Sequence, residues 1–571
     1  MTKTLIRRDA PGAALSADLP PLLNRLYASR GLTTSEDLDL ALRHLLPPAD
    51  LKGIPEAVAV LSAALDAGER ILIVGDFDCD GATSSALMVS VLRSMGATAE
   101  YLVPNRFEYG YGLTPEIVDV GLGLEPNVIV TVDNGISSMA GVRYAKDMGL
   151  RVVVTDHHLP AAELPPADAI VNPNQPGCGF PSKNLAGVGV AFYLLSALRA
   201  SLRRRGWFEA NGVPEPNLAD RLDLVSLGTV ADVVPLDRNN RVLVNEGLRR
   251  IRAGRGLPGI NALIAASGKD ARFLTSVDMA FALAPRLNAA GRLEDMSLGI
   301  NCLLEPQPDK AREMAGRLNE LNVSRRGIEL DMKEQAEASL ARVEAVDAMA
   351  VGLALYEPDW HQGVVGIVAS RIKDRYNRPV FAFAPGDPGE LKGSGRSIEG
   401  LHIRDALDAI AARYQGLVIK FGGHAMAAGL SIREADFPAF RDAFDEEARR
   451  WLARDDLEAT ILSDGELECQ VDVSLARQVL EGGPWGQGFP PPVFDGNFEI
   501  LSQKIVGGRH LKLKARHAKT DQVFDAIAFG KDRLIENRHC RLVFRIDVNL
   551  YNGLMSVQLI VDEVDPVMKT A

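Results

Sequence analysis

Cysteine is scarce in this chain, and its cysteines are scattered. There are five in 571 residues, and none belongs to a Cys-x-x-Cys pair. A disulfide framework is therefore not indicated, and the odd, dispersed set favours reduced thiols. We expect a cytoplasmic protein.

Long apolar runs are missing as well. All runs are far shorter than the ~20 residues that a membrane-spanning helix requires. The segment Met1–Asp9 has no uninterrupted apolar core of the kind found in secretory signals. We therefore expect neither a membrane segment nor a signal peptide.

Positive charge does not predominate, because the formal net charge is −12. This balance argues against a protein that coats nucleic acid indiscriminately. It does not exclude a nuclease, since a metal site itself requires carboxylates and only the local placement of Lys and Arg sets the affinity for phosphate.

The chain is too long for one hydrophobic core, and roughly three or four domains are expected. Residues 1–50 are typical of short helices, and residues 51–304 alternate strands with helices, which predicts a mostly parallel α/β sheet. Residues 305–347 carry one apolar stripe and predict a connecting helix. Residues 348–454 predict a second α/β domain, and residues 455–571 predict the consecutive strands of a small closed barrel.

The most informative motif follows the apolar run Ile71–Gly75. It contains Asp76, Asp78 and Asp80, which alternate along a segment that we expect to be extended. Alternate side chains of an extended segment share one side, so the three carboxylates would repel one another unless a cation binds. A solvated acidic turn is the alternative interpretation.

Three further apolar runs, each interpreted as a strand, end in acidic or imidazole residues. The runs are Val128–Val132, Val152–Thr155 and Leu224–Leu227; the residues beyond them are Asp133, then Asp156, His157 and His158, then Asp232. Sites in open α/β folds form outside the carboxyl ends of the strands, so these groups should meet at one edge of the sheet. Asp and His without Cys suit hard divalent ions.

Four motifs occur in the order found in the DHH phosphoesterases, which the chain resembles. They are Asp78-x-Asp80-Gly81, Asp133-Asn134-Gly135, Asp156-His157-His158 and Gly228-Thr229-Val230-Ala231-Asp232. Two later segments, Gly393–Ser397 and Gly422–His424, are similar to the DHHA1 domain that often follows a DHH domain, and the terminal strands resemble an OB-fold. With the connecting helix, this layout resembles the RecJ family of bacterial single-strand-specific exonucleases over nearly the whole chain.

The resemblance implies a 5′→3′ exonuclease that degrades single-stranded DNA to 5′-mononucleotides in repair and recombination, with two Mn²⁺ or Mg²⁺ ions. The implied metal ligands are Asp78, Asp80, Asp133, His157 and Asp232, with Asp76 either a ligand or a group behind one. His158 would face the scissile phosphate, and Asp156 would orient the imidazoles. Asp80 or Asp133 is expected to bridge the ions, and the mixed ligand set favours Mn²⁺, with zinc as a competitor.

Candidate DNA-binding groups lie in four parts of the chain. They are Arg106 and Tyr109; Arg286, Asn288 and Arg292; Ser394, Arg396, Ser397, Gly423 and His424; and Lys512 and Lys514. Arg binds phosphate bidentately, small residues permit close approach, and OB-folds bind single strands with basic faces and aromatics, for which Phe529 and Tyr551 are candidates. The alternatives are an ordinary loop, a helix cap with surface arginines, and core packing.

Two other functions remain open. One is a DHH phosphodiesterase of short oligonucleotides or cyclic dinucleotides, and the other is a non-catalytic DNA-binding scaffold with the same fold. The long connector and terminal barrel argue against the first, and the intact motifs argue against the second. The family further implies a RecQ-type helicase and the single-stranded DNA-binding protein as partners, and we expect a monomer.

Overall fold

The computed structural model describes residues 3–10, 15–104, 112–344, 350–551, 553–565 and 567–568. It divides into two compact units. The N-terminal unit comprises Ala10–Asn322 and Val471–Pro492. The C-terminal unit comprises Met1–Asp9, Val323–Gln470 and Val493–Ala571.

The N-terminal unit is built on a five-stranded, entirely parallel sheet with the order β3-β2-β4-β5-β6. The strands are β2 (Arg70–Gly75), β3 (Thr98–Leu102), β4 (Val128–Val132), β5 (Arg151–Thr155) and β6 (Ala169–Val171). The predicted parallel α/β sheet is confirmed.

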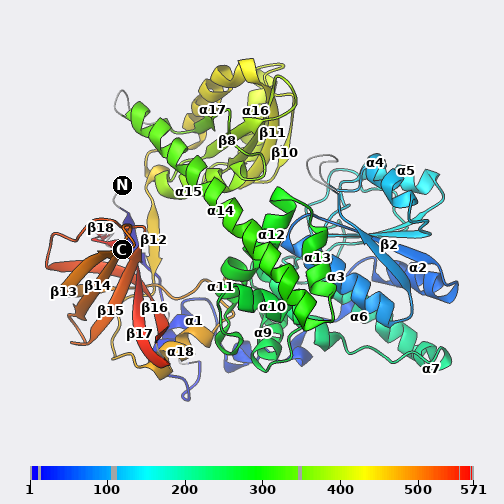
Figure 1. Ribbon diagram of the computed structural model, residues 1–571, viewed down its shortest axis with the longest axis horizontal. Helices are drawn as coiled ribbons and strands as arrows, with labels where there is room; N and C mark the ends of the chain where they lie inside the picture. The colour runs from blue at the N-terminus through cyan, green and yellow to red at the C-terminus, as the bar shows by residue number, and fades with distance from the viewer. Residues whose placement is uncertain are drawn as a thin grey trace. The chain divides into compact units, whose positions relative to one another are not determined.

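Helices cover both faces of this sheet (Figure 1). The helices on one face are α4 (Pro115–Leu122) and α5 (Met139–Asp147); those on the other are α2 (Ile54–Asp66), α3 (Cys79–Ser94) and α6 (Gly187–Arg204). Leu72 and Val74 of β2 pack with α4 and α5, while the alternate residues Ile71 and Ile73 are buried on the opposite face. Burial on both faces explains why the strands are continuous apolar runs.

The rest of the N-terminal unit is helical. Its helices are α1 (Pro21–Ala28), α7 (Trp207–Ala210), α8 (Leu222–Ala231), α9 (Arg238–Arg252), α10 (Pro258–Ala266), α11 (Ser276–Asp278), α12 (Ala284–Leu293), α13 (Ser297–Leu304) and α18 (Val473–Glu481). A π-helical turn, Met279–Leu283, joins α11 to α12. Short 3-10 turns occupy Ser35–Leu38, Leu42–His44 and Pro48–Asp50.

The predicted connecting helix is present as α14 (Pro308–Glu344). Its buried apolar residues recur three, four or fourteen positions apart, which places them on one side of the helix. They include Ala311, Ala315, Leu318, Met332, Ala336 and Leu340. The last three pack in one cluster with helix α15 (Val365–Tyr376) of the C-terminal unit.

The second α/β domain contains a five-stranded mixed sheet with the order β10-β11-β9-β8-β7. Its elements are β7 (Leu353–Tyr356), β8 (Val380–Pro385), β9 (Glu390–Arg396), β10 (Lys420–Gly423), β11 (Ala427–Arg433), α16 (Ile403–Arg413) and α17 (Phe437–Trp451). Phe381 and Phe383 face α16 and α17, whereas Val380 and Ala382 face α15 and α14. The alternation along β8 thus separates two cores.

The predicted small barrel is confirmed as a closed five-stranded sheet. Its strands are β13 (Phe494–Val506), β14 (His510–His517), β15 (Val523–Phe529), β16 (His539–Tyr551) and β17 (Leu554–Val564). The prediction of consecutive strands from residue 455 is wrong at the start of this range, because β12 (Thr460–Ser463) is followed by helix α18, which belongs to the N-terminal unit. The limit 455–571 for the last domain stays a prediction.

The first 50 residues are not purely helical, which corrects the sequence prediction. Strand β1 (Thr4–Arg7) lies between β12 and β18 (Val567–Met568), and both pairings are parallel. Arg7 reaches the fully buried carboxylate of Asp495 with two hydrogen bonds, of 3.1 and 2.7 Å. Such a strand cannot be predicted locally, because its partners lie near the other end of the chain.

Candidate metal centre

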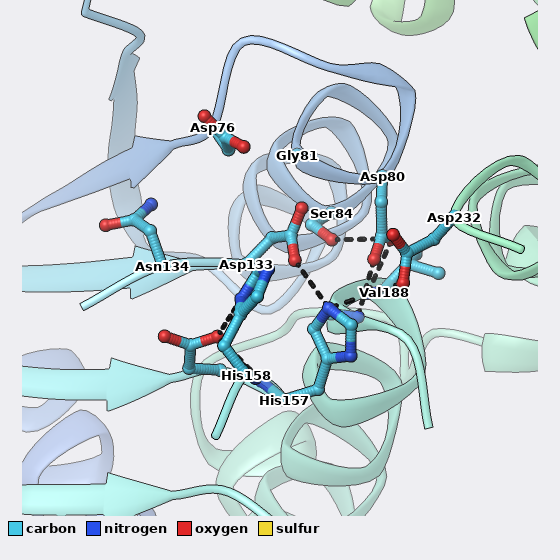
Figure 2. A network of polar contacts seen from close by, with 12 residues as sticks. Asp76, Asp80, Gly81, Ser84, Asp133, Asn134, His157, His158, Val188 and Asp232 are labelled. Carbon is cyan, nitrogen blue, oxygen red and sulfur yellow. Dashed lines mark hydrogen bonds and ion pairs between the residues drawn. The ribbon is translucent and has the colours of Figure 1, made fainter. Parts of the chain in front are cut away.

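Acidic and imidazole groups meet beyond the carboxyl ends of β2, β4 and β5, as the sequence predicts (Figure 2). They form three overlapping groups in which one ligand atom per residue lies within 4.8 Å of the others. The groups are Asp76, Asp78 and Asp133; Asp133, His157 and His158; and Asp80, His157 and Asp232. Asp133 and His157 each belong to two groups, so the cluster is continuous.

The backbone that carries the three aspartates after β2 differs from the extended segment that we expected. The segment does not stay extended, because Asp78 caps helix α3 by accepting a hydrogen bond from the Gly81 amide at 3.0 Å, and Asp80 lies in the first helical turn. Asp76 accepts from the Phe77 amide at 2.7 Å. A Cβ at Gly81 would lie 2.4 Å from the Asp76 carbonyl oxygen, so this tight turn requires glycine.

The amino end of α6 holds Asp80. The amides of Gly187 and Val188 donate to its two carboxylate oxygens at 2.6 and 2.9 Å, where the helix dipole favours negative charge. A Cβ at Gly187 would lie 2.6 Å from the Cβ of Asp133. Sequence reasoning missed this contribution; the glycine at the start of a helical pattern was the available signal.

Asp133 occupies the left-handed region of backbone conformation, with φ +61°. Its Oδ1 lies 3.1 Å from His157 Nε2, which is also 3.4 Å from Asp232 Oδ2. The next residue, Asn134, donates to the carbonyl oxygens of Val74 and Val132 at 3.0 and 2.9 Å. Asn134, which sequence reasoning did not single out for a role, thereby ties β2 to β4 beneath the cluster.

Asp232 comes from a helix rather than a strand, which corrects the sequence prediction. The residues before it form α8, and Asp232 is the residue that ends this helix. The apolar run Leu224–Leu227 is too short for its periodicity to distinguish a strand from a buried helix. Asp232 nevertheless reaches the cluster (Figure 2).

Asp156 organises the two histidines. One of its oxygens, Oδ1, accepts from the amides of His157 and His158 at 2.7 and 3.0 Å, and lies 2.7 Å from His158 Nδ1. The other oxygen accepts from the Ile136 amide at 2.9 Å. Burial alone would lower the pKa of His158, but the bond to Asp156 and its charge outweigh burial and raise that pKa to about 9.

The cluster concentrates negative charge in a buried place. Burial, and then the charge of Asp78, raise the pKa of Asp80 to about 7. The pKa values of Asp133 and Asp232 are raised well above the ordinary range by burial and then by Asp80. Crowded carboxylates with an imidazole form a donor set that suits a divalent cation, because a cation removes the repulsion that otherwise drives protonation.

The DNA-binding candidates of α12 have different surroundings. Asn288 Oδ1 accepts a hydrogen bond from the Cys79 amide at 2.7 Å. This bond links α12 to the first turn of α3, directly after Asp78. The Arg286 guanidinium bonds to Asn319 and to the carbonyl oxygens of Ala282 and Ala266, so much of its donor capacity is used within the fold. Arg292 is half-buried. Arg106 and Tyr109 lie outside the described residues.

In the second α/β domain the candidates lie on β9 and at the end of β10. Arg396 donates to the Ser394 hydroxyl at 3.1 Å, and both are half-buried. Ser397 is buried and donates to the Leu401 carbonyl, which indicates a structural role. Gly423 has φ +146° and precedes His424, which is exposed rather than a core histidine.

On the barrel, Lys512 and Lys514 are exposed on β14 and alternate with the buried Leu511 and Leu513. This confirms the alternation that the sequence predicts. Phe529, on the neighbouring strand β15, is 59% exposed, so it is not a core residue.

Comparisons with known proteins give the chain its class and then its family. The DHH family, N-terminal domain, matches residues 70–229, which contain the sheet and most of the cluster; the DHHA1 domain matches residues 347–450 and the RecJ OB domain residues 463–563. The fold and the cluster thus define a DHH protein. Within that class, the chain belongs to the RecJ family.

One relative, single-stranded-DNA-specific exonuclease RecJ of Escherichia coli, is 51% identical over 99% of both chains. The crystal structure of RecJ from Thermus thermophilus in complex with Mn²⁺ has a TM-score of 0.79 and 31% identity, and the match covers 100% of this chain and 80% of that one. A Mg²⁺ complex of RecJ from the same organism has a TM-score of 0.74 and 29% identity, with 99% and 79% covered.

Proposed function

We propose that this chain is a metal-dependent exonuclease that degrades single-stranded DNA from the 5′ end to 5′-mononucleotides, in DNA repair and recombination. The observation that carries the proposal is the continuous cluster of carboxylates and imidazoles at the sheet edge. The names of its relatives and the ions in the Thermus thermophilus structures support the same function.

The overlapping groups suggest how two ions are held. Asp76, Asp78 and Asp133 would hold one ion, and Asp80, His157 and Asp232 would hold the other, with Asp133 near enough to His157 to serve both. Of the two natural candidates, Mn²⁺ accepts a histidine ligand more readily than Mg²⁺, which prefers oxygen alone. When bound, a pair of divalent ions supplies an activated water and stabilises the leaving oxygen.

The remaining roles belong to residues around the ligands. The pKa of His158 is raised to about 9 in the metal-free protein, and we assign its Nε2–H the role of donating a hydrogen bond to the scissile phosphate. Asp156 fixes that orientation through Nδ1. His157 must be neutral to act as a ligand, so activity declines as the pH falls.

The single strand is gripped by donors outside the cluster. We assign this role to Ser394, Arg396, Gly423 and His424 in the second α/β domain and to Lys512, Lys514 and the exposed Phe529 on the barrel. Asn288 and Arg292 line the path near the ligand loop. Arg286 and Ser397 act by holding these segments in place.

The test is a substrate panel with Mn²⁺: 5′-labelled and 3′-labelled single strands, their duplex, and a dinucleotide. We expect mononucleotide release only from the single strand and only from its 5′ end. Cleavage confined to the dinucleotide would instead favour a short-oligonucleotide phosphodiesterase, and no cleavage would favour a scaffold. Asp133→Asn should abolish cleavage, whereas Asp147→Asn, at an exposed aspartate of α5, should not.

The cellular setting follows from the same proposal. All five cysteines are free, as expected in a reducing cytoplasm. No helix in the described part of the chain is both long and apolar enough to cross a membrane. A RecQ-type helicase that supplies single strands and the single-stranded DNA-binding protein are the proposed partners.

A further inference from the structure

Arg241, on the first turns of α9, is a buried cation with no direct ion pair in the described part of the chain. The residue is only 6% exposed. Within the described ranges, its guanidinium has no hydrogen-bond or ion-pair partner. The Phe489 ring lies 4.5 Å from the guanidinium carbon. Two other arginines of the same helix, Arg249 and Arg250, both pair with carboxylates.

This arrangement is unfavourable as it stands. Removing a guanidinium from water is costly unless an anion or several acceptors replace the water. A cation–π contact with Phe489 offsets only part of that cost. Burial lowers the pKa of Arg241, and the charges of Asp37 and Asp237 offset that effect only in part.

Arg241 lines an open cleft of about 640 Å³ within the N-terminal unit. Apolar and aromatic side chains line it as well, including Leu19, Leu38 and Tyr27. Its size suits a small molecule. None of the residues of the metal cluster contributes to it.

The acidic residues of the cleft are already neutralised by other partners. Asp39 pairs with Arg43 and His44, Glu246 pairs with Arg249, and Glu481 pairs with Arg477. Among the described residues of the lining, Arg241 is therefore the charged side chain without a direct ion pair. A guanidinium with free donors suits an oxyanion with two acceptor oxygens.

We propose that this cleft binds a small, partly apolar molecule that carries a phosphate or carboxylate group. Arg241 binds that group. The apolar part lies against Leu19, Leu38 and Tyr27, and the oxyanion replaces the missing partner of the guanidinium. This binding site is separate from the metal cluster and does not depend on the exonuclease activity.

The test uses the full chain, freed of metal by passage over a chelating resin, in a buffer without carboxylate or phosphate at constant ionic strength, so that the acidic cluster repels anions. Calorimetric titrations are run with inorganic phosphate, thymidine 5′-monophosphate, acetate and thymidine. We expect phosphate or acetate to bind, which distinguishes the two sources of the oxyanion, and we expect the nucleotide to bind more tightly than phosphate. Thymidine, which has no oxyanion, should not bind.

The variants locate the binding. Arg241→Gln should weaken it at least tenfold, about 1.4 kcal/mol, and Arg204→Gln, at an exposed arginine of α6, should leave it unchanged. Ala41→Trp fills the cleft from its rim and should also abolish binding, which keeps the test valid if Arg241→Gln misfolds. Absence of binding by every oxyanion, or equal binding by the intact chain and the Ala41→Trp variant, would overturn the proposal.

Discussion

At the scale of single residues, Asp133 bears two costs in the metal-free protein. It is buried among like charges, and its φ of +61° lies in the left-handed region, which is uncommon for any residue other than glycine although Asp adopts it more readily than most. Strain of this kind tends to be retained where function requires a particular side chain. The carboxylate shared by two groups of ligands is such a requirement.

We predict that Asp133→Gly is more stable than Asp133→Ala by about 0.5–1 kcal/mol in EDTA, since glycine adopts the left-handed conformation freely. Both variants should lack nuclease activity. The measurement is the urea concentration at the midpoint of unfolding for each variant. The midpoints are compared when the unfolding free energy of both variants depends equally on urea concentration. If the alanine variant proves as stable as the glycine variant, the strain assigned to this residue is wrong.

The acidic cluster also predicts a pH dependence. The pKa of Asp80 rises from 3.8 in the unfolded chain to about 7, so the folded metal-free protein binds a proton that unfolding releases. Stability from this group is present at low pH and is lost as the pH rises towards 7. Asp133 and Asp232 shift in the same direction.

We therefore expect the Tm of the metal-free protein to fall between about pH 5 and pH 7.5, as the pKa shift of Asp80 requires. The increase in Tm on adding Mn²⁺ should grow over the same interval, because protons compete with the ion. Differential scanning calorimetry measures how Tm and the increase in Tm on adding Mn²⁺ each change with pH. The Asp80→Asn substitution should reduce the fall of Tm with pH in the metal-free protein. A Tm that rises across this interval without metal would contradict the assignment.

At the scale of elements, the strands that carry the cluster were predictable and the helix at Asp232 was not. Strands β2, β4 and β5 are largely apolar runs of five or six residues that end in Gly75, Val132 and Thr155, each directly before an aspartate. The same kind of run forms α8, where helix–helix packing rather than local pattern decides the structure. The amides of Gly187 and Val188 escaped prediction because a glycine at the start of a helical pattern does not by itself say which side chain the helix end will bind.

Helix α14 provides a prediction of its own. Gly327 lies on its exposed side, and no atom lies within 4 Å of the position that a Cβ would occupy. Gly327→Ala should stabilise the chain by up to about 1 kcal/mol, because alanine has the higher helix propensity. Chemical denaturation measures the gain; a loss of stability would mean that the helix is bent or contacted at this point.

Strand β14 predicts how the barrel contributes to DNA binding. Lys512 and Lys514 are exposed, whereas Arg516 lies 3.5 Å from Glu499 and is partly neutralised. The double variant Lys512→Ala/Lys514→Ala should weaken single-strand binding and reduce the salt slope by roughly 1.4, about 0.7 for each phosphate contact. Lys531→Ala, at a lysine paired with Glu563, is the control. An unchanged salt slope in the double variant would remove β14 from the DNA path.

At the scale of the whole molecule, the contacts between distant parts of the chain were not predicted. Thr4 pairs with Thr460 in one sheet, and helix α18 is grouped with residues that precede Asn322. The alternation of strands and helices, by contrast, is local and gave the parallel sheet, the connector and the barrel. Short strands contain too few residues for a clear periodicity, so their pairing with distant partners cannot be identified from the sequence.

The central claim is that one acidic cluster holds a pair of divalent ions that share Asp133. Equilibrium dialysis of Mn²⁺ against the full chain, with free Mn²⁺ measured by electron paramagnetic resonance, tests it most directly. We predict two bound ions in the intact chain and in Asp147→Asn, and affinity reduced at least tenfold for both ions in Asp133→Ala. Two ions bound with undiminished affinity by Asp133→Ala would contradict the account.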